Sequence, residues 1–317
     1  MDFQNYEDYF EKLLMLDANA PTAAKEFLEQ FLANQTYEMC LRAVAYHGCT
    51  LQWIKEEFKT PEICFIAVQR NGLALEYVRE QTPELCLAAV RRDGWALRYA
   101  EQTPEICLAA VQRNGFSLKL VKRQTSKICL AAVQQDGRAL EHVDKQTSEI
   151  CLAAIRQNGF ALEYMREQTL EICLAAVRQN GYALLDVKNQ TPEICLAAVQ
   201  NNGLSLQFVK EQTPELCLAA VRQNGLALRD MKNQTPEICL AAVQNNGLVL
   251  EYVQKQTSEI CLAAVRQEGS ALKFVQEQTP EICLAAVRRD RRLFEIVNDP
   301  TPELCSIVGR QNGRALR

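Results

Sequence analysis

The sequence predicts an all-α fold, an α-solenoid of about 13 two-helix repeats of 22 residues with a helical N-terminal cap. Three observations predict this fold. A unit such as Thr191 to Gln212, TPEICLAAVQNNGLSLQFVKEQ, recurs with a nearly fixed period from Thr36 to the end of the chain. Each unit carries helix start and stop signals, and its apolar segment does not alternate as a half-buried strand would. Since one unit cannot bury its own apolar face, neighbouring units must stack.

The first helix of each unit begins with a recognisable signal. In a typical unit Thr191 is expected to act as the N-cap, because its hydroxyl can accept a hydrogen bond from the first turn. Pro192 follows at the first helical position, as a proline does in eight of the 13 units. Glu193 then lies beside the positive end of the helix dipole. The run Ile-Cys-Leu-Ala-Ala-Val continues the helix.

The corner between the two helices is marked by Asn or Asp followed by Gly. Glycine takes the left-handed conformation easily, so we expect positive φ at Gly159, Gly203 and Gly225. One unit has Arg291 in place of the glycine, which predicts a distorted or loosened junction there. The second helix is Ala-Leu-x-x-Val with its flanks, and it is expected to end at the Gln before the next Thr.

Two domains are expected, a helical cap over residues 1–35 and a repeat domain over residues 36–317. Tyr6, Tyr9 and Phe10 have helical spacing within the cap, and terminal repeats need atypical caps to cover an exposed apolar face. A docking or targeting helix is the alternative for this segment.

A leucine-rich horseshoe is the alternative to the α-solenoid, because its repeats have a similar period of about 20–29 residues. That fold needs a Leu-x-Leu strand before the Asn. This sequence has Ala-Ala-Val there, which favours the helical fold.

Composition excludes several classes of protein. Lys and Arg total 35 and Asp and Glu total 39, so the net charge is −4. A general nucleic-acid or anionic-membrane binder usually needs a basic face, so neither partner is expected. The longest apolar runs are six residues, such as Ile106 to Val111, far short of a membrane span. The acidic, polar N-terminus lacks the features of a secretory signal, so a cytoplasmic location is expected.

Most of the fourteen cysteines follow the repeat. From Cys64 to Cys305 they recur every 22 residues with one step of 21, Cys40 precedes them by 24, and Cys49 is out of register. A cysteine that occurs once per repeat is a packing position. Equivalent residues of adjacent units should lie about 9–10 Å apart, whereas a disulfide needs Cα atoms within about 7 Å. We therefore expect buried, reduced thiols.

No pattern in the sequence indicates catalysis. His47 and His142 lie about four repeats apart, and the chain has no Cys-x-x-Cys pair for a zinc site. His47 and Cys49 form the only close His/Cys pair, which is interpreted as a divergent corner of a terminal repeat. No catalytic residue, cofactor, metal or small-molecule substrate is expected, and the protein is predicted not to be an enzyme.

Two charged features of the sequence, a recurring glutamate and an arginine cluster, are explained without a ligand. A glutamate follows the cap of almost every first helix, as at Glu193, where it compensates the helix dipole; an acidic stripe facing a basic partner is the alternative. Arg288, Arg289, Arg291 and Arg292 form the only dense basic cluster. A solvated corner is favoured over a phosphate or nuclear-import site.

The motifs Leu218-Ala219-Ala220-Val221, Asn224-Gly225 and Ala227-Leu228, with their counterparts in other units, resemble a known family. This family comprises the helical repeats of unknown function found in giant viruses and in amoeba-associated intracellular bacteria. The resemblance covers about residues 36–317. It implies an intracellular interaction protein, host- or virus-associated or an effector of an intracellular bacterium, with no catalytic residues.

Comparison of the units predicts a binding face. The Ile-Cys-Leu-Ala-Ala-Val positions barely change, whereas the residue after Gly and the second helix vary, so the variable positions lie off the stacking surface. Aromatic residues there would suit a protein partner, although neutral drift on a solvated face is the alternative. The predicted function is a non-enzymatic scaffold for protein–protein interaction; the alternative is a structural strut of a virion or large complex. The predicted protein-binding residues are Trp95, Tyr99, Phe116, Phe160, Tyr164 and Tyr182.

Overall fold

The computed structural model describes residue 29 and residues 31–312 of the chain. The predicted cap therefore lies mostly outside the described residues. Of its last residues, Phe31 and Gln35 are buried, and Gln35 Nε2 donates a 2.6 Å hydrogen bond to the Trp53 carbonyl. The segment just before Thr36 thus packs on the first repeat.

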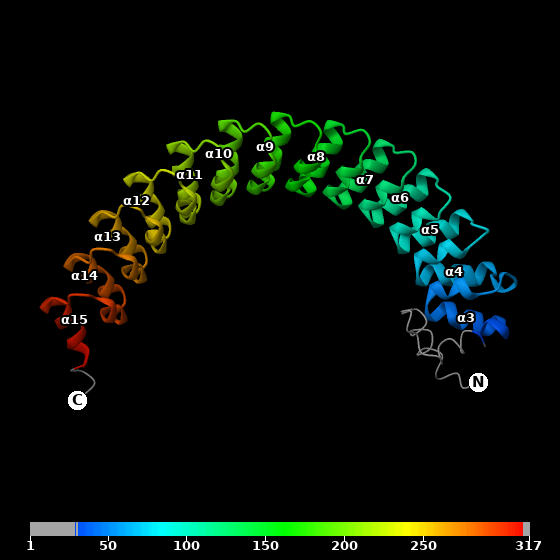
Figure 1. The fold of residues 1–317 in the computed structure, drawn as a ribbon, viewed down its shortest axis with the longest axis horizontal. Coiled ribbons are helices and arrows are strands. Elements are labelled where there is room, and N and C mark those ends of the chain that lie inside the picture. Colours follow the sequence, from blue (N-terminus) through cyan, green and yellow to red (C-terminus); the bar gives the residue numbers. More distant parts are fainter. Residues whose placement is uncertain (1–28, 30, 313–317) are drawn as a thin grey trace. The chain divides into compact units, whose positions relative to one another are not determined.

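The regular structure of the described residues is entirely helical, which confirms the predicted all-α repeat fold. The chain divides into two compact units, Met1–Gln157 and Asn158–Arg317. Within each unit, short α-helices stack side by side in chain order (Figure 1). The α-helices are α3 (Tyr37–Tyr46), α4 (Pro61–Arg70), α5 (Pro83–Arg92), α6 (Pro104–Arg113), α7 (Ser126–Gln135), α8 (Ser148–Gln157), α9 (Leu170–Gln179), α10 (Pro192–Asn201), α11 (Pro214–Gln223), α12 (Pro236–Asn245), α13 (Ser258–Gln267), α14 (Pro280–Arg289) and α15 (Pro302–Asn312).

The second element of each repeat is a short 3₁₀ helix, tighter than the sequence indicates. In the repeat that begins at Thr191 it covers Gly203–Phe208, and its C-cap amide, Val209 N, bonds the Leu206 carbonyl three residues back at 3.0 Å. The 3₁₀ helices are η2 (Gly48–Trp53), η3 (Glu56–Phe58), η4 (Gly72–Tyr77), η5 (Gly94–Arg98), η6 (Gly115–Leu120), η7 (Gly137–His142), η8 (Gly159–Tyr164), η9 (Gly181–Asp186), η10 (Gly203–Phe208), η11 (Gly225–Asp230), η12 (Gly247–Tyr252), η13 (Gly269–Phe274) and η14 (Arg291–Ile296). Neighbouring 3₁₀ helices contact one another within each unit, so they form a second layer beside the α-helices.

The predicted cap at the start of each α-helix is confirmed. Thr191 Oγ1 accepts a 3.3 Å hydrogen bond from the Ile194 amide. At the other end, Asn202 has an extended backbone, and its amide donates to the Ala198 carbonyl at 2.9 Å. Its side-chain oxygen then accepts from the Leu204 amide at 3.1 Å. One asparagine therefore ends the α-helix and begins the 3₁₀ helix.

The prediction of positive φ at the corner glycines is wrong. No glycine among the described residues has a positive φ, so Gly159, Gly203 and Gly225 do not turn the corner. The glycine is required instead because the next repeat lies too close for a side chain. A Cβ on Gly203 would lie 2.4 Å from the carbonyl oxygen of Ala220, which is far inside van der Waals contact.

The core is assembled from the same positions in every repeat. Ile194, Cys195, Ala198 and Val199 of α10 are buried, and Leu206 of η10 is fully buried beneath them. Burial of each large aliphatic side chain contributes about 1.5–3 kcal/mol. Since the constant residues form this core, the variable residues are left for the surface.

The junction at Arg291 is loosened, as the sequence predicts. The 3₁₀ helix η14, which begins at Arg291, buries none of its residues, whereas η13, which begins at a glycine, buries three. In the following α15, Cys305 is exposed, whereas its counterpart Cys283 is buried. Position 291 carries an exposed arginine where the other corners have a glycine that the next helix approaches closely.

Candidate functional site

A glutamine before each cap joins successive repeats. Gln190 Nε2 donates to the Phe208 carbonyl at 2.8 Å, and its Oε1 accepts from the Lys210 amide at 3.0 Å and from the Cys195 thiol at 3.7 Å. The same bonds to a carbonyl and an amide of the next repeat are made by Gln35, Gln81, Gln102, Gln124, Gln168, Gln190, Gln212, Gln234, Gln256 and Gln278. The sequence analysis treated this glutamine only as a boundary, although its recurrence in the units was visible.

All fourteen cysteines are free thiols, and twelve of them are buried, as predicted. Cys49 is half-buried and Cys305 is exposed. Burial raises the pKa of the repeat thiols above the ordinary value, in the case of Cys40 to about 11. Since the thiolate is the nucleophile, these buried cysteines are poorly suited to chemistry.

The two histidines have structural contacts. His47 stands at the N-cap of η2, where its Nδ1 accepts from the Cys49 amide at 3.3 Å, so this pair is a corner as predicted. The Cys49 sulfur in turn accepts a 2.9 Å bond from Asn71 Nδ2. His142 meets Phe116 edge to face, with ring centroids 5.9 Å apart. Within residue 29 and residues 31–312, no three His, Cys, Asp or Glu side chains are grouped so as to hold a metal ion.

The predicted aromatic residues occupy two positions of the 3₁₀ layer. Trp95, Phe116, Phe160 and Tyr182 directly follow the corner residue Gly or its equivalent, and Tyr99 and Tyr164 lie at or just after the end of a 3₁₀ helix. Phe160 is 39% exposed, and the other five are half-buried.

The described ring contacts join a predicted residue to a neighbouring repeat. Tyr182 meets Phe208 edge to face at 5.8 Å, as Phe116 meets His142. Lys119 Nζ lies 4.4 Å from the centroid of the Trp95 ring, within reach of a cation–π interaction. Trp95, Phe116 and Tyr182 thus each contact a residue of the next 3₁₀ helix and remain half-buried.

The dense basic cluster is held by local partners. Arg292 bonds Asp290 at 2.9 Å and holds the pKa of that carboxyl below its ordinary value. Arg289 Nη1 donates to the Arg266 carbonyl at 2.8 Å, and Arg288 lies 3.7 Å from Glu303. These bonds fit the interpretation of this cluster as a solvated corner.

A second set of side-chain bonds lies at the end of each α-helix. Gln223, the last residue of α11, accepts from the Gly203 amide of the preceding repeat at 2.6 Å through Oε1, and its Nε2 donates to the Asn201 carbonyl at 3.4 Å. We call the corresponding position in every repeat the helix-end position. Its glutamine or asparagine accepts from a glycine amide in the pairs Gly115–Gln135, Gly137–Gln157, Gly159–Gln179, Gly181–Asn201, Gly203–Gln223, Gly225–Asn245 and Gly247–Gln267.

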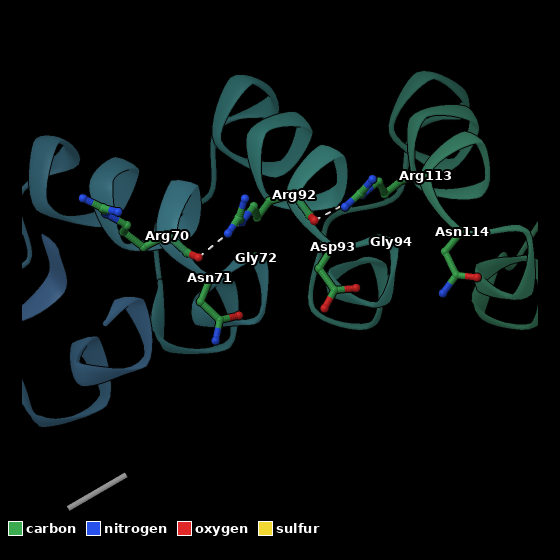
Figure 2. A pocket seen from close by; sticks show the side chains of 8 residues that line it. All are labelled: Arg70, Asn71, Gly72, Arg92, Asp93, Gly94, Arg113 and Asn114. Carbon is green, nitrogen blue, oxygen red and sulfur yellow. Dashed lines mark hydrogen bonds between the residues drawn. The ribbon is translucent and has the colours of Figure 1, made fainter. Parts of the chain in front are cut away.

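Three successive repeats of the N-terminal unit have arginine at the helix-end position. Arg92 Nε donates to the Arg70 carbonyl at 3.3 Å, and Arg113 Nε donates to the Arg92 carbonyl at 3.3 Å. Figure 2 shows the three arginines in one row and the three corner caps in a parallel row. Together they line a pocket of about 670 Å³, whose residues are Arg70, Asn71, Gly72, Arg92, Asp93, Gly94, Arg113 and Asn114.

This pocket was not apparent from the sequence, because its arginines lie 22 and 21 residues apart and form no dense basic cluster. A comparison of the units at the helix-end position alone would have shown arginine in three successive units, and again at Arg289, against glutamine or asparagine in the units between them. We call this set the arginine pocket.

Among the described residues, every helix is too short or too polar to span a bilayer.

The chain matches a family described as a domain of unknown function, DUF4116, over residues 36–81, 82–124, 125–169, 149–191, 169–213, 191–234 and 235–279. Most of these segments span two of the 22-residue repeats. No curated protein and no solved structure gives a significant match.

Proposed function

The chain belongs to the DUF4116 family of repeat proteins of unknown function, and from this premise we propose that it is a non-enzymatic scaffold that binds another protein. The proposal places it inside a host cell or a virus-associated assembly, with the exposed 3₁₀ layer as the binding face. No nucleic acid, membrane or small-molecule substrate is proposed as its partner.

One observation supports this proposal: most of the residues that repeat take part in stacking, and several large residues that vary lie exposed or half-buried on the 3₁₀ layer. Gln190, Cys195 and Gly203 each bond or closely approach a group in the same or the next repeat. In the 3₁₀ layer, by contrast, Phe160 and Leu185 are 39% and 62% exposed. Contiguous exposed apolar side chains can mark a protein-interaction surface.

The aromatic residues of this face are the proposed anchors for the partner. Tyrosine and tryptophan are enriched among residues that dominate binding energy, and each is worth about 2 kcal/mol or more on truncation. The half-buried rings are already held by neighbours such as Phe208 and His142, so they lose little side-chain freedom on binding.

Site-specific photo-crosslinking tests the proposed face. A photoreactive phenylalanine analogue at Phe160 should capture one discrete protein in the native host. The same analogue at Leu196, which is 38% exposed on the α-helical layer, serves as the matched control. Equal capture at both positions would contradict a binding face on the 3₁₀ layer, and capture of the chain by itself would indicate the structural strut.

A second variant separates binding from packing. If the predicted aromatic residues of the 3₁₀ layer form a recognition surface, Tyr99→Ala combined with Tyr164→Ala should abolish capture of that protein. Thermal stability should then stay nearly unchanged. Loss of stability by several kcal/mol, as for buried aromatic truncations, would show that the rings serve packing alone.

A further inference from the structure

The arginine pocket is lined by donors that the other repeats satisfy internally. In the repeats with glutamine or asparagine at the helix-end position, that side chain supplies the acceptor for the preceding glycine amide. A guanidinium has five donors and no acceptor. Accordingly, among the described residues no group accepts a hydrogen bond from the amides of Gly72 or Gly94, the corner glycines of the repeats that precede Arg92 and Arg113.

The guanidiniums themselves are also available. No carboxylate of the described chain forms an ion pair with Arg70, Arg92 or Arg113, although other arginines such as Arg138 and Arg292 do so at their own corners. Arg92 and Arg113 each donate through Nε to a carbonyl (Figure 2), and among the described residues their terminal nitrogens make no hydrogen bond. One opposing charge lines the pocket, Asp93, whose Oδ1 accepts from the Trp95 amide at 2.9 Å.

From this geometry we propose that the arginine pocket binds an acidic, extended polypeptide segment. Three guanidiniums against one carboxylate give the pocket a net positive charge, and the two unpaired amides add donors at the same place. Carboxylates are bound by guanidinium forks with charge-assisted hydrogen bonds, which are stronger than neutral ones. The short 3₁₀ helices that begin at Gly72 and Gly94 are not the source of this charge; the arginines supply it.

The spacing of the arginines selects an extended chain over a small anion. Successive repeats place the arginines about 8–10 Å apart, as packed helices are. The outer two, Arg70 and Arg113, lie two repeats apart, which is beyond the span of a single phosphate or carboxylate. An extended polypeptide in the polyproline II conformation has three residues per turn and rises about 3.1 Å per residue, so acidic side chains at every third position lie on one face and recur about every 9 Å. This inference rests on the proposed function, because it assigns the chemistry of one segment of the protein partner.

Fluorescence anisotropy with the full chain tests the site. The probe is a fluorescein-labelled peptide with glutamate at every third position and serine between, and an isomer with the same glutamates adjacent is the matched probe. We expect the spaced peptide to bind about tenfold more tightly than the clustered one, since only the spaced form reaches two arginines at once. Equal binding of the two isomers, or tighter binding of a single-stranded oligonucleotide of equal charge, would overturn the proposal.

The matched protein variants use residues that the chain already tolerates. Arg92→Gln installs the side chain found at position 135 and equivalent positions, and it should weaken binding of the spaced peptide about tenfold or more, as for loss of a charged hydrogen bond. Arg91→Gln removes the same charge from an exposed neighbour that does not line the pocket, and it should change binding less than about twofold. Equal losses in the two variants would show a general charge effect and overturn the site.

Asp93→Asn provides a variant with the opposite expectation. Asparagine caps the neighbouring corners at Asn71 and Asn114, so the fold is retained while the opposing charge is removed. Binding of the spaced peptide should tighten about two- to fivefold, as for removal of an unfavourable surface charge; unchanged or weaker binding would contradict the proposal. The outcome is separable from the proposed function, because Arg92→Gln leaves the crosslinking position at Phe160 intact.

Discussion

The repeats with an amide at the helix-end position and the repeats with arginine there share one fold but differ in chemistry. At Gln223 the side chain both accepts from the Gly203 amide and donates to a carbonyl, so the corner is closed by internal bonds. At Arg92 the side chain only donates, and the corner opens into a pocket lined by charge. The residue at the helix-end position therefore determines whether the glycine amide of the preceding repeat has a side-chain acceptor.

The difference is permitted because other bonds hold both kinds of repeat. Gln81 and Gln102, in the arginine-containing repeats, make the same inter-repeat bonds as Gln190 in the amide-containing ones. In both kinds of repeat the corner residue is glycine, and the carbonyl of the next α-helix lies where a Cβ would be, as it does for Gly72 and Gly203. The four predictions below test what the repeats share and then what separates them.

The largest effect is expected at the shared glycine. Gly203→Ala places a methyl group 2.4 Å from the Ala220 carbonyl oxygen and should lower the free energy of unfolding by about 3 kcal/mol or more, measured by denaturant melts. Leu204→Ala, at the variable neighbouring position, is the control and should cost much less. Gly203→Asn tests the cause, since asparagine tolerates positive φ well; a mild effect of that variant would contradict the close-approach explanation.

The second effect is expected at the shared glutamine. Gln190→Leu removes bonds to the Phe208 carbonyl and the Lys210 amide and leaves both groups without that partner, so we expect a loss of about 2–3 kcal/mol in the same melts. Gln207→Leu is the control, because the side chain of Gln207 is exposed and bonds only its own repeat. Similar losses of unfolding free energy for the two variants would show that the inter-repeat bonds of Gln190 contribute no more than the local bond of the exposed Gln207.

A reciprocal exchange addresses the position at which the repeats differ. Gln223→Arg should cost about 1–2 kcal/mol, because the Gly203 amide loses its acceptor. Arg92→Gln should be neutral or stabilise by up to about 1 kcal/mol, because it provides an acceptor for the Gly72 amide. A destabilised Arg92→Gln variant would mean that the arginine, and not the amide, is the better stacking residue in its own repeat.

The periodic sequence allowed the fold to be predicted because local signals agree in every unit. Thr191 caps, Asn202 ends the helix, and the constant apolar residues face the neighbouring repeats, as expected. The corner was correctly predicted at the glycine, but the reason given for the glycine, a positive φ, is wrong. Glycine satisfies both a left-handed backbone and a close approach, and only the structure shows that Ala220 of the next repeat requires the latter.

The arginine pocket was not predicted because it depends on which positions of different repeats come together. A count of dense charges points to the Arg288 cluster, whose members have local partners. The periodic arginines are separated by a whole repeat in the chain and adjoin one another only after stacking. The aromatic residues, by contrast, were placed on the 3₁₀ layer from variability alone, and their role in binding stays a prediction.

The smallest effect is expected where two aspartates share one repeat position under different electrostatics. Asp230 is paired with Arg229 at 3.2 Å, whereas the residue before Asp186 is Leu185. Burial, with a smaller contribution from Glu163, raises the pKa of Asp186 above its ordinary value. The folded state therefore binds this proton more tightly than the unfolded state, and stability falls as pH rises through the interval between the two pKa values.

Asp186→Asn removes this decline, because asparagine does not ionise. At pH 7 the variant should be more stable than the parent by less than about 1 kcal/mol, since the site is half-buried and partly screened. Below about pH 3, Asp186 is protonated in both the folded and the unfolded state, so the stability gain of Asp186→Asn should vanish. Asp230→Asn, which loses an ion pair instead, should give no gain at pH 7. Melting temperatures at the two pH values measure the effect, and a gain for Asp186→Asn that persists in acid would assign it to packing and not to charge.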